Sequence, residues 1–441
     1  VYTANASDTS GAVSYSIAFS DTVGNAGTAV TNGTGSVTFD KTAPTMAITA
    51  SGVSDGGTSN DGTLSLTFTS SEATTDFAVS DITVSGGSLG ALSGSGTTYT
   101  ATFTPSGAGA TTIDVAGGAF TDAAGNNNTA ATQFNWTYDG TAPTLSSVSI
   151  ASNNSTTTLA KADDVVTLTF TASETIATPV VTFKSGDAAI TDTSVTYENT
   201  SGNTWTAVYT TNASDISGAV SYSIAFSDTV GNAGTAVTNG TGSVTFDKTA
   251  PTMAITASGV SDGGTSNDGT LSLTFTSSEA TTDFAVSDIT VSGGSLGALS
   301  GSGTTYTATF TPSGAGATTI DVAGGAFTDA AGNNNTAATQ FNWTYDGTAP
   351  TLSSVSIASN NSTTTLAKAD DVVTLTFTAS ETIATPVVTF KSGDAAITDT
   401  SVTYENTSGN TWTAVYTTNA SDISGAVSYS IAFSDTVGNA G

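Results

Sequence analysis

Residues 63–70 read TLSLTFTS, and this stretch indicates the fold class of the chain. Leu64, Leu66 and Phe68 alternate with hydroxyl side chains, which is the two-residue period of a strand with one buried face. The same alternation runs through residues 99–103, and clusters of Gly, Asn, Asp and Ser separate such runs as turns do. No segment of helical length shows a 3.6-residue period. The chain is therefore predicted to be all-β.

The number and spacing of the strands favour one kind of β fold. Seven short strands in about 100 residues, with a turn roughly every eight to twelve residues, are typical of an immunoglobulin-like β-sandwich. The first domain of this kind is expected to have strands at residues 45–52, 63–70, 80–86, 88–93, 97–104, 111–119 and 132–138. A related pattern, with alternating apolar residues at 205–209 and 220–226, indicates a second version of the same fold.

The chain repeats with a period of 207 residues. The segment VYTANASDTSGAVSYSIAFSDTVGNAG at residues 1–27 returns at Val208 and Val415, with Thr in place of Ala4 and Ile in place of Thr9. The sequence opens without Met inside one repeat and stops inside another, so we expect it to be a window on a longer array. Because each domain of such an array contacts mainly its neighbours, tandem Ig-like sandwiches arranged as an extended rod are predicted.

Each period contains two unlike domains, separated by the phrase Asp-Lys/Gly-Thr-Ala-Pro-Thr. This phrase begins at Asp40, Asp139, Asp247 and Asp346. The predicted domains are therefore the C-terminal part of a type-two domain at 1–39, type one at 40–138, type two at 139–246, type one again at 247–345, and a truncated type two at 346–441.

The composition excludes several kinds of function. The chain has no Cys for disulfides or thiolate metal sites, no His, and six basic residues that are all Lys. Its formal net charge of −30 opposes binding to nucleic acid. No apolar run approaches the roughly 18–20 residues that a membrane-spanning helix needs. Without His or Cys, only carboxylates, Lys or hydroxyls could do chemistry, and we expect no enzyme.

The four Trp residues fall in strand patterns and are expected to pack in cores, and Lys184 is the one plausible lysine for an isopeptide crosslink.

Three acids that are distant in sequence are predicted to meet at one end of each sandwich. Asp40 lies on the linker, Glu72 ends the second strand, and Asp122 lies in the turn between the last two strands. Close carboxylates repel one another, and Ca²⁺, which accepts 6–8 oxygen ligands, relieves that repulsion. Asn126 would add an amide oxygen. A plainer reading, in which these are solvated turn residues, stays open. The full predicted set of calcium ligands is Asp40, Glu72, Asp122, Asn126, Asp139, Glu174, Asp228, Asn232, Asp247, Glu279, Asp329, Asn333, Asp346, Glu381, Asp435 and Asn439.

Several of these segments resemble the bacterial Ig-like repeats of giant extracellular adhesins and repetitive cell-surface proteins. The resemblance is carried by the linker phrase, by SDITVSGGSLGALSGSGTTYTATFTP at 80–105, by FTDAAGN at 120–126 and by TLTFTASETIATPVVTFKSG at 167–186. It implies an extracellular location on the bacterial cell surface and calcium at the domain junctions, on Asp40, Glu72, Asp122 and their counterparts. It also implies that adhesion resides in a terminal domain outside these residues.

Two functions of different classes are consistent with the sequence. The first is a non-catalytic spacer or filament, stiffened by calcium, that projects an adhesive tip or builds an extracellular fibre, coat or biofilm. The second is a module that binds glycans or another cell through exposed sandwich faces. The expected partners are the neighbouring repeats, identical chains in lateral contact through edge strands, and a surface glycan or cell receptor bound by the tip.

Overall fold

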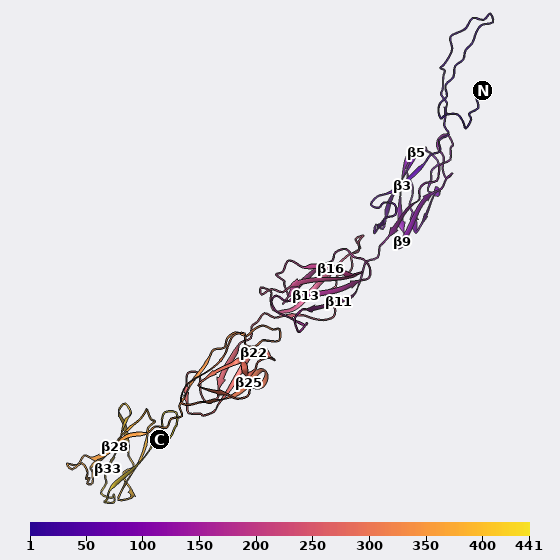
Figure 1. Ribbon diagram of the computed structural model, residues 1–441. Helices are drawn as coiled ribbons and strands as arrows, with labels where there is room; N and C mark the ends of the chain where they lie inside the picture. The colour runs from indigo at the N-terminus through magenta and orange to yellow at the C-terminus, as the bar shows by residue number, and fades with distance from the viewer. The chain divides into compact units, whose positions relative to one another are not determined.

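The computed structural model describes residues 1–441, and the chain is all-β (Figure 1). Apart from strands it has only two short 3₁₀ turns, Val79–Asp81 and Val286–Asp288. No helix has the length and apolar character that a membrane crossing requires. The chain forms two compact units by its internal contacts. The first comprises Val1–Ala151, Val166–Tyr209 and Val220–Ser243, and the second comprises Ser152–Val165, Thr210–Ala219 and Val244–Gly441.

The type-one domain is a sandwich of two four-stranded sheets. One sheet has the order β3 (Met46–Ala50), β5 (Leu64–Thr74), β8 (Ser93–Pro105) and β7 (Gly87–Leu89). The other has the order β4 (Thr58–Ser59), β10 (Phe134–Tyr138), β9 (Gly109–Val115) and β6 (Ile82–Ser85). The second copy repeats both sheets with β20 (Met253–Ala257), β22 (Leu271–Thr281), β25 (Ser300–Pro312) and β24 (Gly294–Leu296), and with β21 (Thr265–Ser266), β27 (Phe341–Tyr345), β26 (Gly316–Val322) and β23 (Ile289–Ser292).

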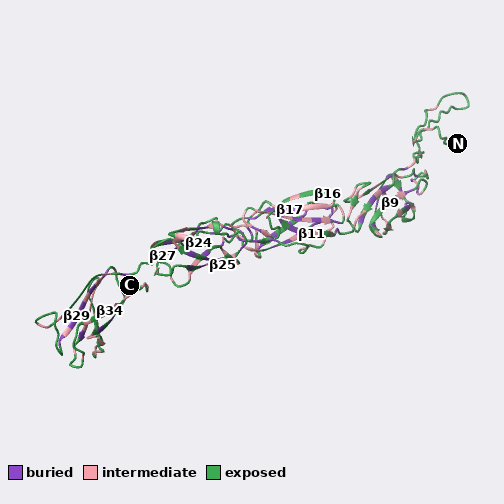
Figure 2. Cartoon of the chain, turned by 60° about the horizontal axis from the view of Figure 1, so that its bottom comes forward, coloured by how far each residue is buried: buried purple, intermediate pink, exposed green.

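The apolar residues of the predicted alternation form the buried face of this sandwich. Leu64, Leu66 and Phe68 are fully buried, whereas the residues between them face outward or are half-buried. Trp136, on the opposite sheet, is 2% exposed, which confirms its prediction as a core residue. Burying each such side chain stabilises the fold by about 1.5–3 kcal/mol. Phe68 also packs against Phe77, with ring centroids 5.8 Å apart. Figure 2 shows buried residues in purple along the strands of the domains.

Each of the seven predicted strands of residues 40–138 overlaps a strand of the structure, but the fourth, predicted at 88–93, is only β7 at Gly87–Leu89, because β8 already begins at Ser93. The structure also adds one short strand. β4, of two residues, pairs in parallel with β10, so the first strand of the sandwich changes sheet between β3 and β4. Two residues are too few to show an alternation, which is why the sequence pattern did not reveal β4. β5 and β8 run longer than predicted, with an irregularity in their pairing between Thr69 and Thr74.

The type-two domain is a sandwich of the same kind. One sheet has the order β11 (Leu145–Ser152), β13 (Val165–Ala172), β17 (Thr204–Thr210) and β16 (Thr196–Ser201). The other has the order β12 (Leu159–Ala160), β19 (Thr245–Phe246), β18 (Gly218–Ala225), β14 (Val180–Ser185) and β15 (Ala188–Ala189). In residues 346–441 the sheets are β28 (Leu352–Ser359), β29 (Val372–Ala379), β33 (Thr411–Thr417) and β32 (Thr403–Ser408), and β31 (Ala395–Ala396), β30 (Val387–Ser392) and β34 (Val427–Ala432).

The first 39 residues form a separate two-stranded hairpin. β1 (Gly11–Ala12) pairs with β2 (Thr38–Phe39), and a further bridge joins Ile17 to Val30. This segment corresponds to the last two strands of a type-two sandwich, and its apolar side chains are exposed: Ile17 is 54% and Phe19 is 55% exposed. The segment beside the label N in Figure 2 is accordingly drawn almost entirely in green.

Candidate metal centre

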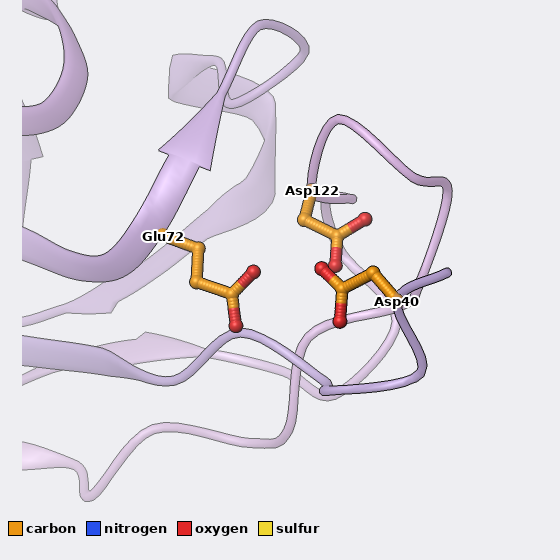
Figure 3. A group of neighbouring side chains, drawn as sticks. All are labelled: Asp40, Glu72 and Asp122. Atoms are coloured by element: carbon orange, nitrogen blue, oxygen red, sulfur yellow. The ribbon is translucent and has the colours of Figure 1, made fainter. Parts of the chain in front are cut away.

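Three carboxylates meet at one end of the first type-one sandwich, as the sequence predicts. Glu72 lies near the end of β5, Asp122 lies in the turn after Phe120, and Asp40 lies on the linker that enters the domain. One oxygen from each of the three lies within 4.8 Å of the other two. Figure 3 shows the three carboxylates pointing toward the same space from these three separate segments.

The linker is held against β5 by backbone contacts. The Thr45 amide donates to Ser71 Oγ at 2.9 Å, and the Ser71 amide donates to the Thr45 carbonyl at 3.0 Å. Asp40 Oδ1 accepts a hydrogen bond from the Thr42 amide at 3.0 Å, which turns the linker. Because Ser71 directly precedes Glu72, these contacts bring Asp40 close to the Glu72 carboxylate.

Hydrogen bonds from within its own turn fix the position of the Asp122 carboxylate. Asp122 Oδ1 accepts hydrogen bonds from the backbone amides of Ala124 (2.8 Å) and Asn126 (2.9 Å), and Oδ2 accepts one from Asn126 Nδ2 (2.8 Å). Gly125 has a φ of 90°, a conformation that glycine adopts without steric cost and that this tight turn requires. The Asp-x-x-Gly-Asn sequence therefore encodes the geometry of the turn locally.

The same arrangement is present in every copy. The other converging triads are Asp139, Glu174 and Asp228; Asp247, Glu279 and Asp329; and Asp346, Glu381 and Asp435. In each, the Asp on the turn is buried and the other two acids are half-buried. The four Asn residues that follow the turn are Asn126, Asn232, Asn333 and Asn439, and each donates from Nδ2 to the turn Asp and to the backbone carbonyl of the linker Asp.

The acids of one triad differ in their protonation behaviour. Burial raises the pKa of Glu72, and the neighbouring carboxylates of Asp40 and Asp122 raise it further. Burial also opposes ionisation of Asp122, but the hydrogen bonds from Asn126 and from the turn amides outweigh it and lower its pKa. The Glu174, Glu279 and Glu381 carboxyls have raised pKa values for the same reasons as Glu72. Asp122 is therefore held in its ionised form, whereas the ionised form of Glu72 is destabilised.

The donor set fits a hard divalent cation. Every ionisable ligand of a triad is a carboxylate oxygen, which Ca²⁺ and Mg²⁺ prefer, and the site has no imidazole or thiolate that would favour zinc. Every interaction that shifts the pKa of Glu72 raises it, so no neighbouring cation compensates its charge. A bound cation would remove this repulsion. The three carboxylates are the groups that would hold it, and the role of these residues as ligands stays a prediction.

The four Asn residues take a different position from the one expected. The amide nitrogen, not the amide oxygen, faces the acids, and Asn126 Nδ2 lies 3.2 Å from the Asp40 carbonyl oxygen. In this arrangement Asn126 joins the turn to the linker and positions two of the carboxylates. Coordination through its oxygen remains a prediction that no contact in the structure supports.

The structure adds two residues that no pattern in the sequence singles out. Lys161 Nζ donates to the Gly332 carbonyl at 2.9 Å, and Asn154 Nδ2 donates to the Ala331 carbonyl at 2.9 Å. Gly332 and Ala331 belong to the turn of Asp329, so a type-two domain contacts the acidic turn of the type-one domain that follows it. The partners of these bonds are more than 170 residues apart in sequence, and no local pattern could have shown the contact.

The structure also shows where Lys184 and the four Trp residues lie. Lys184 is exposed on β14, opposite Ala189 and Ser221, and not in the core where an isopeptide bond would form. Trp343 is buried like Trp136, whereas Trp205 and Trp412 are half-buried.

Comparison with known proteins classifies half of the alternating domains. Residues 40–138 and 247–345 match the family described as the bacterial Ig-like domain. These two domains are bacterial Ig-like domains. No curated protein matches the chain.

Solved structures similar to this chain include proteins with Ig-like domains in tandem. A tetra-tandem repeat in the extending region of a large adhesion protein has 17% identity and a TM-score of 0.30, and the match covers 90% of this chain and 97% of that one. Invasin, a bacterial integrin-binding protein, has 14% identity, a TM-score of 0.31 and 76% coverage of each chain. A three-domain segment of titin has 10% identity and a TM-score of 0.31, covering 69% of this chain and 98% of its own. With such low identities and TM-scores, the family match is the finding that classifies the two domains.

Proposed function

We propose that this chain is a non-catalytic spacer segment of a bacterial extracellular or surface protein, stiffened by calcium at its domain junctions. The carboxylate triad beside each linker carries the proposal, because its position links cation binding to the angle between neighbouring domains. The bacterial Ig-like domain family is consistent with a structural or adhesive role outside the cell.

Calcium would act by neutralising repulsion and by joining three segments. A cation held by Asp40, Glu72 and Asp122 would tie the linker to two loops of the sandwich, so that the linker moves with the domain. Extracellular calcium modules have dissociation constants of about 10⁻⁴–10⁻³ M. Such sites are loaded outside a cell, and the spacer would stiffen where it has to project an adhesive tip.

The test measures stiffness together with cation loading. Small-angle scattering of the 441-residue chain in calcium is expected to give a longer maximum dimension and a narrower distribution of shapes than in chelator. A variant with Gln in place of Glu72, Glu174, Glu279 and Glu381 should lose most of this response. A control variant with Gln in place of Glu198 and Glu405, which are exposed on β16 and β32, should keep it. Identical scattering with calcium and with chelator would contradict the proposal.

A glycan array distinguishes the spacer from a binding module. The spacer is expected to bind no glycan selectively through its sandwich faces. Strong selective binding by the 441-residue chain would instead support the alternative in which those faces recognise a cell surface.

A further inference from the structure

The basic residues of the chain, all lysines, are unevenly placed. They are Lys41, Lys161, Lys184, Lys248, Lys368 and Lys391. Lys41 and Lys248 stand second in the linker phrase before a type-one domain. Before a type-two domain this position is Gly140 or Gly347, and the type-one domains have no other basic residue. The junction between a type-one domain and the type-two domain after it therefore receives no lysine from the linker or from the domain before it.

Lys161 of the type-two domain reaches forward to the acidic turn of the next type-one domain. Besides the hydrogen bond from its Nζ to the Gly332 carbonyl, its stem lies over Gly332, with Cδ and Cε 3.8 Å from the position that a Cβ there would take. Asp164 Oδ2 accepts hydrogen bonds from the Lys161 amide and from Asn154 Nδ2, both at 2.8 Å. Asp164 thus orients the loop from which Lys161 and Asn154 contact the turn. All four residues belong to the second compact unit.

Lys248 makes the reciprocal contact, from the linker back to the type-two domain. Its Nζ donates to the carbonyls of Ala213 at 2.9 Å and of Asp215 at 2.6 Å. These two acceptors also lie in the second compact unit. Lys41, the counterpart of Lys248, donates to the Ala6 carbonyl at 2.9 Å, so the contact recurs where the linker phrase recurs. Because an ammonium donates in each case, these are charge-assisted hydrogen bonds, which are stronger than those between neutral groups.

The residue two places before it explains why glycine replaces this lysine in the other linker. A Cβ at Gly140 would collide with the phenol of Tyr138. Tyr138 packs edge-on against Trp136, with ring centroids 6.0 Å apart, so a side chain at residue 140 would have to displace a packed ring. In the linker of Lys248 the corresponding residue is Phe246, which has no hydroxyl and is fully buried. The two forms of the linker phrase therefore belong to two different local structures.

At the junction before a type-two domain, a neutral amide approaches the acidic turn instead of an ammonium. Asn60 Nδ2 lies 3.5 Å from the position that a Cβ at Gly231 would take, in the turn of Asp228. Asn267 approaches Gly438 in the same way, at 3.6 Å. The contact with the acidic turn is therefore uncharged at this kind of junction and charge-assisted at the other.

We propose that Lys161 and Lys248 form a lysine lock, which holds the junction between a type-two domain and the next type-one domain rigid without a metal ion, and that the opposite kind of junction is the flexible one. The two lysines reach across the junction from opposite sides, so bending it would break charge-assisted hydrogen bonds at two separate places. Bending the junction before residue 139 would break no such bond. Flexibility would then be confined to every second junction of the array. The lysine lock uses carbonyl acceptors and no calcium, so it stands apart from the proposed function.

The experiment compares the two kinds of junction within the 441-residue chain, in chelator. The chain has no Cys, so a pair of introduced Cys residues can carry two spin labels. The pair Glu198→Cys and Thr307→Cys spans the junction with the lysine lock, and the pair Glu198→Cys and Thr100→Cys spans the junction before residue 139. Thr100 and Thr307 are equivalent exposed positions on β8 and β25, and Glu198 is exposed on β16. Pulsed dipolar spectroscopy is expected to give a narrower distance distribution for the pair with residue 307, and equal widths would overturn the proposal.

A double variant removes the lysine lock and leaves the sandwiches intact. Lys161→Gln combined with Lys248→Gln is expected to widen the distance distribution between residues 198 and 307, while the distribution between residues 100 and 198 stays the same and shows that the domains remain folded. Lys184→Gln removes the same charge from an exposed position on β14 and should leave both distributions as in the parent chain. An unchanged width in the double variant, or equal widening by Lys184→Gln, would contradict the lysine lock. Because every measurement is made in chelator, failure of calcium binding at the triads would leave this result unaffected.

Discussion

Asn126 Nδ2 lies 3.2 Å from the backbone oxygen of Asp40, which is 86 residues earlier in the chain. This contact makes the acidic turn and the linker a single structural element, and it is repeated in all four copies. The position of the linker carboxylate beside the other two therefore depends on a neutral side chain, and this dependence can be tested separately from the charges.

Asn126→Ala should loosen one triad without removing a carboxylate. Loss of the amide leaves Asp122 with fewer hydrogen bonds and frees the linker, and we expect calcium affinity at this site to fall about 10–100-fold, as for other residues that position ligands. Hydrogen exchange with mass spectrometry on residues 120–128 measures the loosening. The unaltered copy at 327–335, distinguished by its mass, serves as an internal control, and equal protection of both segments would contradict the role of Asn126.

Replacing all four triad Glu residues by Gln should change stability in opposite directions with and without calcium. In chelator the variant is expected to melt at a higher temperature than the parent chain, because it removes the repulsion that raises the pKa of each Glu. In excess calcium it should melt lower, because the parent gains about 2.7 kcal/mol per site when calcium exceeds the dissociation constant a hundredfold. Melting curves of the variant and the parent chain, in chelator and in calcium, check both predictions. A difference in melting temperature between the two proteins that is the same in chelator and in calcium would contradict calcium binding at the triads.

The metal-free chain should become more stable as the pH falls through the raised pKa values of the four Glu residues. Between the ordinary and the raised pKa, the folded state binds more protons than the unfolded state, so stability falls as pH rises there. The lowered pKa of Asp122 acts at more acidic pH and in the opposite direction, so that its stabilisation is lost as its carboxylate protonates. The melting temperature in chelator, measured as a function of pH, checks both effects. The four-Gln variant is the control, and its melting temperature should not rise as the pH falls through the raised pKa values of the Glu residues.

The sandwich core should respond strongly to a single truncation. Phe68→Ala removes a fully buried ring that packs on Phe77, and an unfolding cost of about 3–5 kcal/mol is expected for the domain at 40–138. Ser65→Ala, on the exposed face of the same strand, should cost within about 0.5 kcal/mol. Hydrogen exchange in the two type-one domains compares the mutated copy with its unmutated partner at 247–345. Similar protection in both copies of the Phe68 variant would contradict the predicted core.

Much of the fold could be predicted because the signals are local. Leu64, Leu66 and Phe68 alternate within one strand, and Gly, Asn, Asp and Ser clusters mark the turns between strands. The convergence of Asp40, Glu72 and Asp122 could also be predicted, because the sandwich topology brings their three loops together. Contacts that depend on the orientation of a side chain, or on a partner far along the chain, could not be predicted from the sequence. The inward-facing nitrogen of Asn126 and the bond from Lys161 to Gly332 are of this kind.

The central claim is that each carboxylate triad holds one calcium ion. Isothermal titration calorimetry of the chelator-treated 441-residue chain tests it most directly. We predict about one calcium ion per triad, with dissociation constants in the range of about 10⁻⁴–10⁻³ M or tighter, and loss of this binding in the four-Gln variant but not in the Glu198 and Glu405 control. No heat of binding, confirmed by equilibrium dialysis, or unchanged binding in the four-Gln variant would contradict it.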